Sequence, residues 1–131
     1  MAASIVPVAK TIYLCDHVLS MAIHGTLKTD IIGLVNSIRA PSFPHVATKF
    51  CAFAQLTGGL GLVPFFVLVK HAATDDQVYQ TPDRTLRFPT RSFVVHMSQA
   101  INHCVFPWPG IYLAELYCNN QWVADTTLLL H

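Results

Sequence analysis

The sequence predicts an all-β domain, a two-sheet antiparallel β-sandwich of about seven to nine strands with an Ig-like or jelly-roll-like arrangement. Runs rich in β-branched and aromatic residues recur along the chain, and Gly and Pro separate them. The chain also ends in a strong hairpin signal around Asn119-Asn120. A length of 131 residues suffices to bury a core without disulfides or metal, so we expect a single domain over 1–131.

The expected strands follow one another between these breaks, although residues 16–24 fit either a turn of helix or an irregular strand. Gly33 interrupts the second run and indicates a β-bulge. Residues 50–69 are uncharged and have the length of a membrane span, but their glycines and Pro64 favour two strands about a turn. The expected strands are 9–15, 26–38, 46–57, 62–72, short pieces near Val78 and Leu86, 92–106, 111–118 and 121–130.

The last two strands allow their two faces to be assigned. Asn119-Asn120 favours a type I′ turn, which sets Tyr117 opposite Trp122 and fixes the pairs behind them. We expect one face in the core: Tyr112, Ala114, Leu116, Cys118, Val123, Thr127 and Leu129, with Asp125 as its only charge. The other face carries Ile111, Leu113, Tyr117, Trp122, Ala124 and Leu128, with Glu115 as its only charge. Since neither face is polar, we expect both to be covered, the second by another chain or by a second sheet of this chain.

The composition favours a protein that works in an assembly. Charged residues make up 11% of the chain, against the ~25% typical of soluble domains. The net charge is +1, and scattered Lys and Arg give no basic stripe for nucleic acid. We therefore expect a non-enzymatic structural or assembly subunit that binds a protein partner or itself, without a membrane span. The expected contact residues are Ile111, Leu113, Tyr117, Trp122 and Leu128.

A ligand-binding β-sandwich is the alternative, with carbohydrate as a possible ligand. In that case Trp108, Tyr117 and Trp122 would form a stacking platform on the surface. A protein that sediments as a single monomeric species would favour this module over an assembly subunit.

The sequence gives little support to catalysis, metal or cofactor binding. Its seven histidines are dispersed, without the spacing of a zinc site, and no nucleophile elbow or phosphate loop is present. Four cysteines lie in apolar runs without CxxC spacing, which predicts reduced thiols and a cytoplasmic location. The first residues lack the basic region of a secretory signal. We therefore expect no enzyme activity, no metal and no cofactor.

Five short motifs are spread along the chain: Leu14-Cys15-Asp16-x-Val18, Gly25-Thr26-Leu27, Ile32-Gly33, Pro41-Ser42-Phe43-Pro44 and Phe106-Pro107-x-Pro109-Gly110-x-Tyr112. Together they resemble a family of small uncharacterised bacterial β-sandwich proteins, a domain of unknown function. The resemblance covers nearly the whole chain and implies a bacterial, intracellular, non-enzymatic domain without catalytic residues.

Overall fold

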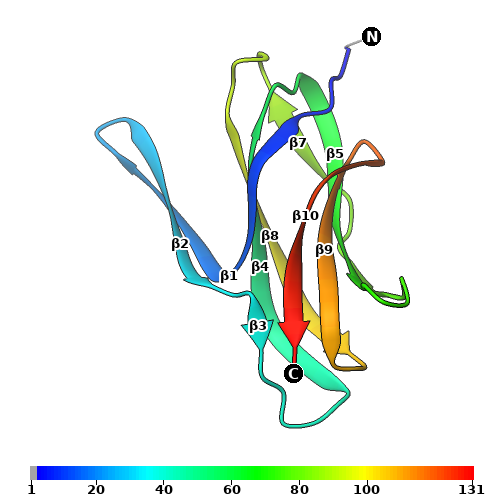
Figure 1. Ribbon diagram of the computed structural model, residues 1–131. Coiled ribbons are helices and arrows are strands. Elements are labelled where there is room, and N and C mark those ends of the chain that lie inside the picture. The colour runs from blue at the N-terminus through cyan, green and yellow to red at the C-terminus, as the bar shows by residue number, and fades with distance from the viewer. Residues whose placement is uncertain (1–2) are drawn as a thin grey trace.

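A computed structural model describes residues 3–131 as two packed β-sheets, which confirms the predicted β-sandwich (Figure 1). Within this range every regular element is a strand. The strands are β1 (Val8–Ile23), β2 (Thr26–Leu34), β3 (Ser37–Ile38), β4 (His45–Thr57), β5 (Gly61–His71), β6 (Gln77–Gln80), β7 (Arg84–Phe88), β8 (Val95–Phe106), β9 (Gly110–Cys118) and β10 (Gln121–Leu130).

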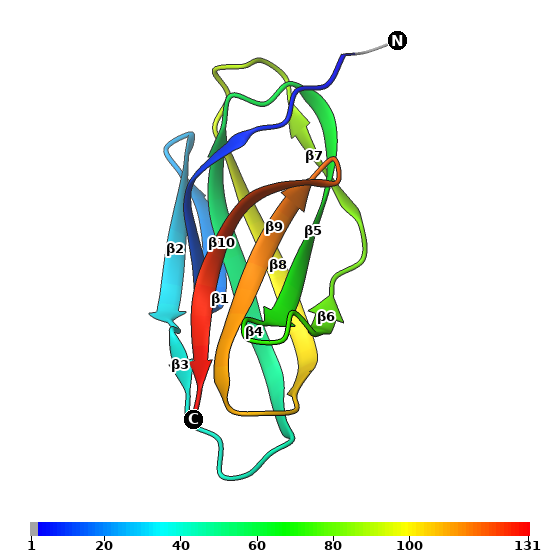
Figure 2. The ribbon, with the colours of Figure 1, turned by 45° about the vertical axis from the view of Figure 1, so that its right-hand side comes forward.

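The four-stranded sheet has the order β2-β1-β4-β8, and the larger sheet has the order β3-β10-β9-β5-β6, with β7 also paired to β5. All pairs are antiparallel except β10 with the two-residue β3. In Figure 2, β10, β9 and β5 pass in front of β4 and β8, so the two sheets form the two layers. The uncharged run 50–69 forms most of β4, a turn and most of β5, and within residues 3–131 no helix is long and apolar enough to cross a membrane.

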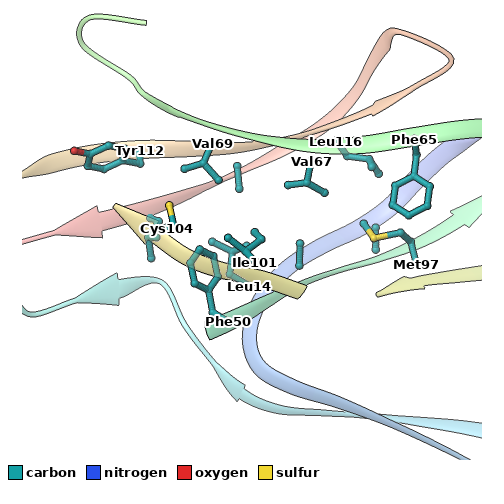
Figure 3. Packing of buried hydrophobic residues seen from close by; sticks show 14 of the residues in the cluster. Leu14, Phe50, Phe65, Val67, Val69, Met97, Ile101, Cys104, Tyr112 and Leu116 are labelled. Carbon is teal, nitrogen blue, oxygen red and sulfur yellow. The ribbon is translucent and has the colours of Figure 1, made fainter. Parts of the chain in front are cut away.

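The core lies between these layers, and every second side chain along each central strand points into it. From the four-stranded sheet come Leu14, Phe50, Met97 and Ile101, and from the larger sheet Val67, Tyr112 and Leu116, all buried (Figure 3). The Tyr112 hydroxyl is satisfied at the edge of this core, because it donates to the Trp108 carbonyl over 2.7 Å. A buried hydroxyl without a partner would destabilise the fold.

The final hairpin keeps its predicted turn but not its predicted register. Asn119 and Asn120 have φ of 53° and 60°, as a type I′ turn requires, and Tyr117 pairs with Trp122. The register then shifts, so that Ala124 pairs with Leu116 and Val123 is an extra residue. Every later residue of β10 therefore points to the face opposite to the one predicted.

This shift corrects several assignments on β10. Leu128 is 1% exposed and belongs to the core, whereas Leu129 is 42% exposed and points outward with Thr127. Ala124 likewise moves to the inner face, opposite Leu116. The physical reason is Asp125: an unshifted register would bury this carboxylate, while the bulge places it outward beside Glu115.

Residues 16–24, which the sequence left open, continue β1 into a projecting hairpin with β2. In Figure 1 this hairpin stands away from the body of the sandwich. The chain bends where Asp16 meets Gly33, whose φ is +70°. This φ favours glycine, and a Cβ on Gly33 would also force the Asp16 side chain to move. The register is the same on both sides of Gly33, so the predicted β-bulge is wrong, although the interruption is real.

Candidate functional site

The most distinctive surface feature is a row of three aromatic side chains across the outer face of the larger sheet. Phe66 on β5 pairs with Tyr117 on β9, and Tyr117 pairs with Trp122 on β10. The rings of Phe66 and Tyr117 are stacked, with centroids 5.0 Å apart and planes at 10°. Trp122 is 54% exposed, so the row ends in an open aromatic surface. We call this side of β5, β9 and β10 the outer face; besides the row it carries Leu68, Lys70, Ile111, Leu113, Glu115, Asp125 and Leu129.

A buried carboxylate lies next to the aromatic row on the same face of the sheet. Glu115 is only 5% exposed although it belongs to the outer face, and Leu68 on β5 covers it from one side. Tyr117 donates its hydroxyl proton to Glu115 Oε1 over 3.2 Å. Lys70 Nζ lies 3.5 Å from the same oxygen and 3.1 Å from Asp75 Oδ1 in the β5–β6 loop. The carboxylate is therefore satisfied by neighbours on its own sheet, as a buried charge must be.

The charges in this cluster reinforce one another. The hydrogen bond to Asp75 and the negative charge of Glu115 raise the pKa of Lys70. Burial, followed by the charge of Glu115, raises the pKa of the Tyr117 hydroxyl. Lys70 thus stays charged and Tyr117 stays neutral at physiological pH, which are the forms that hold Glu115 in place.

This arrangement is better suited to binding than to acid–base chemistry. A general base must reach the proton that it removes, and Glu115 already accepts the Tyr117 hydroxyl inside the sheet. Two hollows of the surface, one near Leu60 and Phe88 and one near Thr29 and His96, are lined by other residues. The outer face presents exposed aromatic and aliphatic side chains, with the buried Glu115 already paired and Asp125 exposed beside it.

The residues expected at an interface are mostly, but not all, on this face. Ile111 is 51% exposed, Leu113 is partly buried beside it, and Tyr117 is partly buried at the other end of β9. Leu128 does not fit this set because it points into the core, and Leu129, the partner of Ile111, takes its place.

The three aromatic residues of the expected ligand platform do not come together. Trp108 precedes β9 and packs edge-on against His71, whereas Tyr117 and Trp122 lie at the other end of the strand. Trp108 lies beside Tyr112, whose hydroxyl is bonded to the Trp108 carbonyl. Tyr112 and Tyr117 are five residues apart on β9, which corresponds to ~16 Å along the strand. Phe66 also stacks on one ring face of Tyr117, so a sugar cannot stack on that face.

Sequence reasoning missed Phe66, Leu68 and Lys70, which complete the outer face. All three lie on β5, where both faces are apolar enough that alternation gives no direction. Their place beside Tyr117 and Glu115 depends on the pairing of β5 with β9, which brings together segments far apart in the chain.

A second surface feature is the groove of about 490 Å³ between the projecting hairpin and the start of β8. Thr29 Oγ1 and His96 Nδ1 share a hydrogen bond of 3.0 Å across it, and the His96 ring packs edge-on against Phe53. The groove is lined by Ser20, Leu27, Thr29, Arg87, Phe93, Val94, Val95 and His96.

The cysteines and acidic residues are arranged as structural groups. The four cysteines are free and buried, which agrees with the predicted reduced thiols. Burial raises the pKa of Cys104 to about 12 and the pKa of Cys118 to about 11, so neither is a reactive thiolate at neutral pH. Within residues 3–131 no three His, Cys, Asp or Glu side chains are grouped so as to hold a metal ion.

Taken together, the two sheets and the outer face define a β-sandwich with exposed aromatic and aliphatic side chains on one sheet. The chain belongs to a family of unknown function, DUF6941, whose model matches residues 10–131. The family therefore covers both hairpins and the outer face. A comparison with curated proteins gives no match.

Proposed function

We propose that the protein is a non-enzymatic assembly subunit that makes protein–protein contacts through the outer face. The observation that carries this proposal is the exposure of Trp122, Ile111 and Leu129, at 54%, 51% and 42%, on one face of a regular sheet. Aromatic residues such as Trp and Tyr anchor protein interfaces, and charge is depleted at the centre of such contacts.

The internal pairing of the charges supports the same function. Because Lys70 and Tyr117 hold Glu115, docking on this face would not strip water from an unpaired carboxylate. Asp125 is exposed beside Glu115, midway along the face between Trp122 and Leu129, and no ion pair involves it among residues 3–131. The matching partner surface therefore carries a basic side chain for Asp125 and apolar groups on either side of it, for Trp122 and for Ile111.

The test is the sedimentation of wild type against a Leu113→Asp, Trp122→Glu double variant, each purified from the native host. We expect the double variant to keep its β-sheet circular dichroism and to lose an association step that wild type shows. If the double variant does not fold, Trp122→Glu alone can be used in the same sedimentation test, because the exposed Trp122 contributes little to the core.

Val105→Glu is the matched control, since Val105 is 42% exposed but lies on β8 of the other sheet. It should sediment like wild type. If wild type is a monomer at high concentration and purifies without partners, or if Trp122→Glu changes nothing, the outer face is not an assembly contact.

We further propose a reducing, cytoplasmic location, supported by the four free and buried thiols. Fractionation of the native host should find the protein with cytoplasmic markers. Recovery from an oxidising compartment would contradict this location.

A further inference from the structure

The β1–β2 hairpin ends the smaller sheet in a long open edge. β2 lies at one end of the order β2-β1-β4-β8, and among the described residues β1 is its only strand partner. Along the opposite edge, β8, two backbone groups have side-chain partners: Tyr79 accepts from the Asn102 amide at 3.4 Å, and Arg84 donates to the Ser98 carbonyl at 3.3 Å. An open edge of this kind offers backbone groups to another strand.

The tight turn of the hairpin determines which backbone groups face that edge. His24 and Gly25 have φ of 51° and 76° and connect the closing pair Ile23 and Thr26. In a two-residue hairpin the closing pair is hydrogen-bonded, and bonded pairs alternate with unbonded pairs from there. The backbone groups of Lys28 and Asp30 therefore point to β1. Those of Leu27, Thr29 and Ile31 point to the open edge.

The sequence of β2 is complementary to itself about Thr29. Gly25 and Gly33, both with positive φ, bracket the regular segment 26–32, and Thr29 is its centre. A second copy of β2 pairing antiparallel through a two-fold axis at Thr29 would bring Lys28 opposite Asp30 of that copy, twice. It would also bring Leu27, which is 65% exposed, opposite Ile31.

The charges favour such pairing instead of preventing it. Lys28 and Asp30 would form pairs without backbone bonds, in which facing side chains come closest. Within their own hairpin they face the neutral Met21 and Leu19, and within residues 3–131 the structure shows ion pairs only at Lys70. Charged side chains, Lys above all, usually protect a strand edge against pairing. Here Lys28 and Asp30 have opposite signs, so in this register the charges of two copies attract each other.

We propose that β2 pairs with β2 of a second copy of this chain, in antiparallel register centred on Thr29, to form a two-fold dimer. This contact is separate from the outer face, since it uses the other sheet. The two smaller sheets then become one continuous sheet across the dimer.

Charge exchange at the edge tests both the dimer and its register. Lys28→Asp places two carboxylates opposite each other and Asp30→Lys places two ammonium groups, so each variant alone should weaken the dimer by on the order of tenfold or more. Mixing the two variants should restore association as a heterodimer. The Lys28→Asp, Asp30→Lys double variant should again form a homodimer, because its charges are complementary.

Sedimentation equilibrium of purified wild type, the variants and their mixture measures these outcomes. A monomeric wild type, or single variants that dimerise as wild type does, overturns the proposal. A mixture that stays monomeric overturns the register and with it the proposed pairing. The Trp122→Glu variant distinguishes the β2 contact from the outer face. We expect this variant to form the β2 dimer as wild type does. If Trp122→Glu is the variant that loses the dimer and the charge variants keep it, the dimer forms through the outer face and pairing at β2 is wrong.

Discussion

The two long hairpins of this protein, β1–β2 and β9–β10, are similarly rich in apolar residues but are placed in different environments. In β9–β10, Leu116 and Leu128 are 0% and 1% exposed because the second sheet covers them. In β1–β2, Leu27 is 65% exposed and Leu19 is 48% exposed, since both lie in the part of the hairpin that leaves the sandwich at Gly33. Figure 1 shows one hairpin within the body and the other standing off it.

This difference separates stability from association. Burial on folding stabilises the fold of the chain itself, at roughly 25 cal/mol per Å² of apolar surface. An exposed apolar hairpin gains that energy only when another surface covers it. We therefore expect β9–β10 substitutions to alter unfolding and β1–β2 substitutions to alter association.

The largest expected effect tests the bulge in β10. Leu128→Ala should lower the free energy of unfolding by ~2–5 kcal/mol, through lost burial and a residual cavity. Its neighbour Leu129→Ala is the control, and we expect at most about 0.5 kcal/mol because this side chain is largely exposed. Urea denaturation measures both. The reverse order would show that β10 follows the unshifted register, and equal effects would contradict the assignment of Leu128 to the core and Leu129 to the surface.

Alkaline pH should weaken the sandwich through its buried thiols. Burial raises the pKa of Cys104 from 9.0 to about 12, so above pH 9 the unfolded chain releases a proton that the folded chain retains. This contribution is complete below pH 9 and is lost as pH rises toward 12, at no more than about 1.4 kcal/mol per pH unit. Urea denaturation at pH 8 and pH 10.5 should show the loss. Cys104→Ala should have a shallower pH slope, and an unchanged slope would contradict this cause.

A smaller effect is expected at the polar cluster of β9. Tyr117→Phe removes the hydroxyl donor from the buried Glu115 carboxylate and should lower the free energy of unfolding by ~1–3 kcal/mol. In a Glu115→Gln background the same substitution should cost less, since a neutral amide needs the donor less. A double-mutant cycle by urea denaturation measures this coupling. Additive effects would mean that the hydrogen bond contributes nothing.

The smallest expected effect lies in the projecting hairpin. Leu27→Ala should change the free energy of unfolding of the monomer by less than about 0.5 kcal/mol, although leucine is replaced within a strand. Dilute protein avoids any contribution from association. A loss comparable to that of Leu128→Ala would show that the hairpin packs against the body and would remove the contrast between the two hairpins.

The sequence by itself determined the fold class, most strand positions and the turn at Asn119-Asn120. These depend on local preferences: β-branched runs form strands, glycine and proline interrupt them, and Asn accepts the positive φ of a type I′ turn. Tyr112 and Leu116 were placed correctly in the core because they lie on β9, where alternation from the turn is undisturbed.

Tertiary structure decided the rest. One extra residue at Val123 exchanged the faces of Leu128 and Leu129. This bulge keeps Asp125 out of the core, and the core exists only because the second sheet packs against β10. The pairing of β5 with β9 brought Phe66 and Lys70 to the outer face. Such contacts join segments far apart in the chain. They depend on which strand surfaces pack against each other, and the local sequence pattern of one strand does not contain this information.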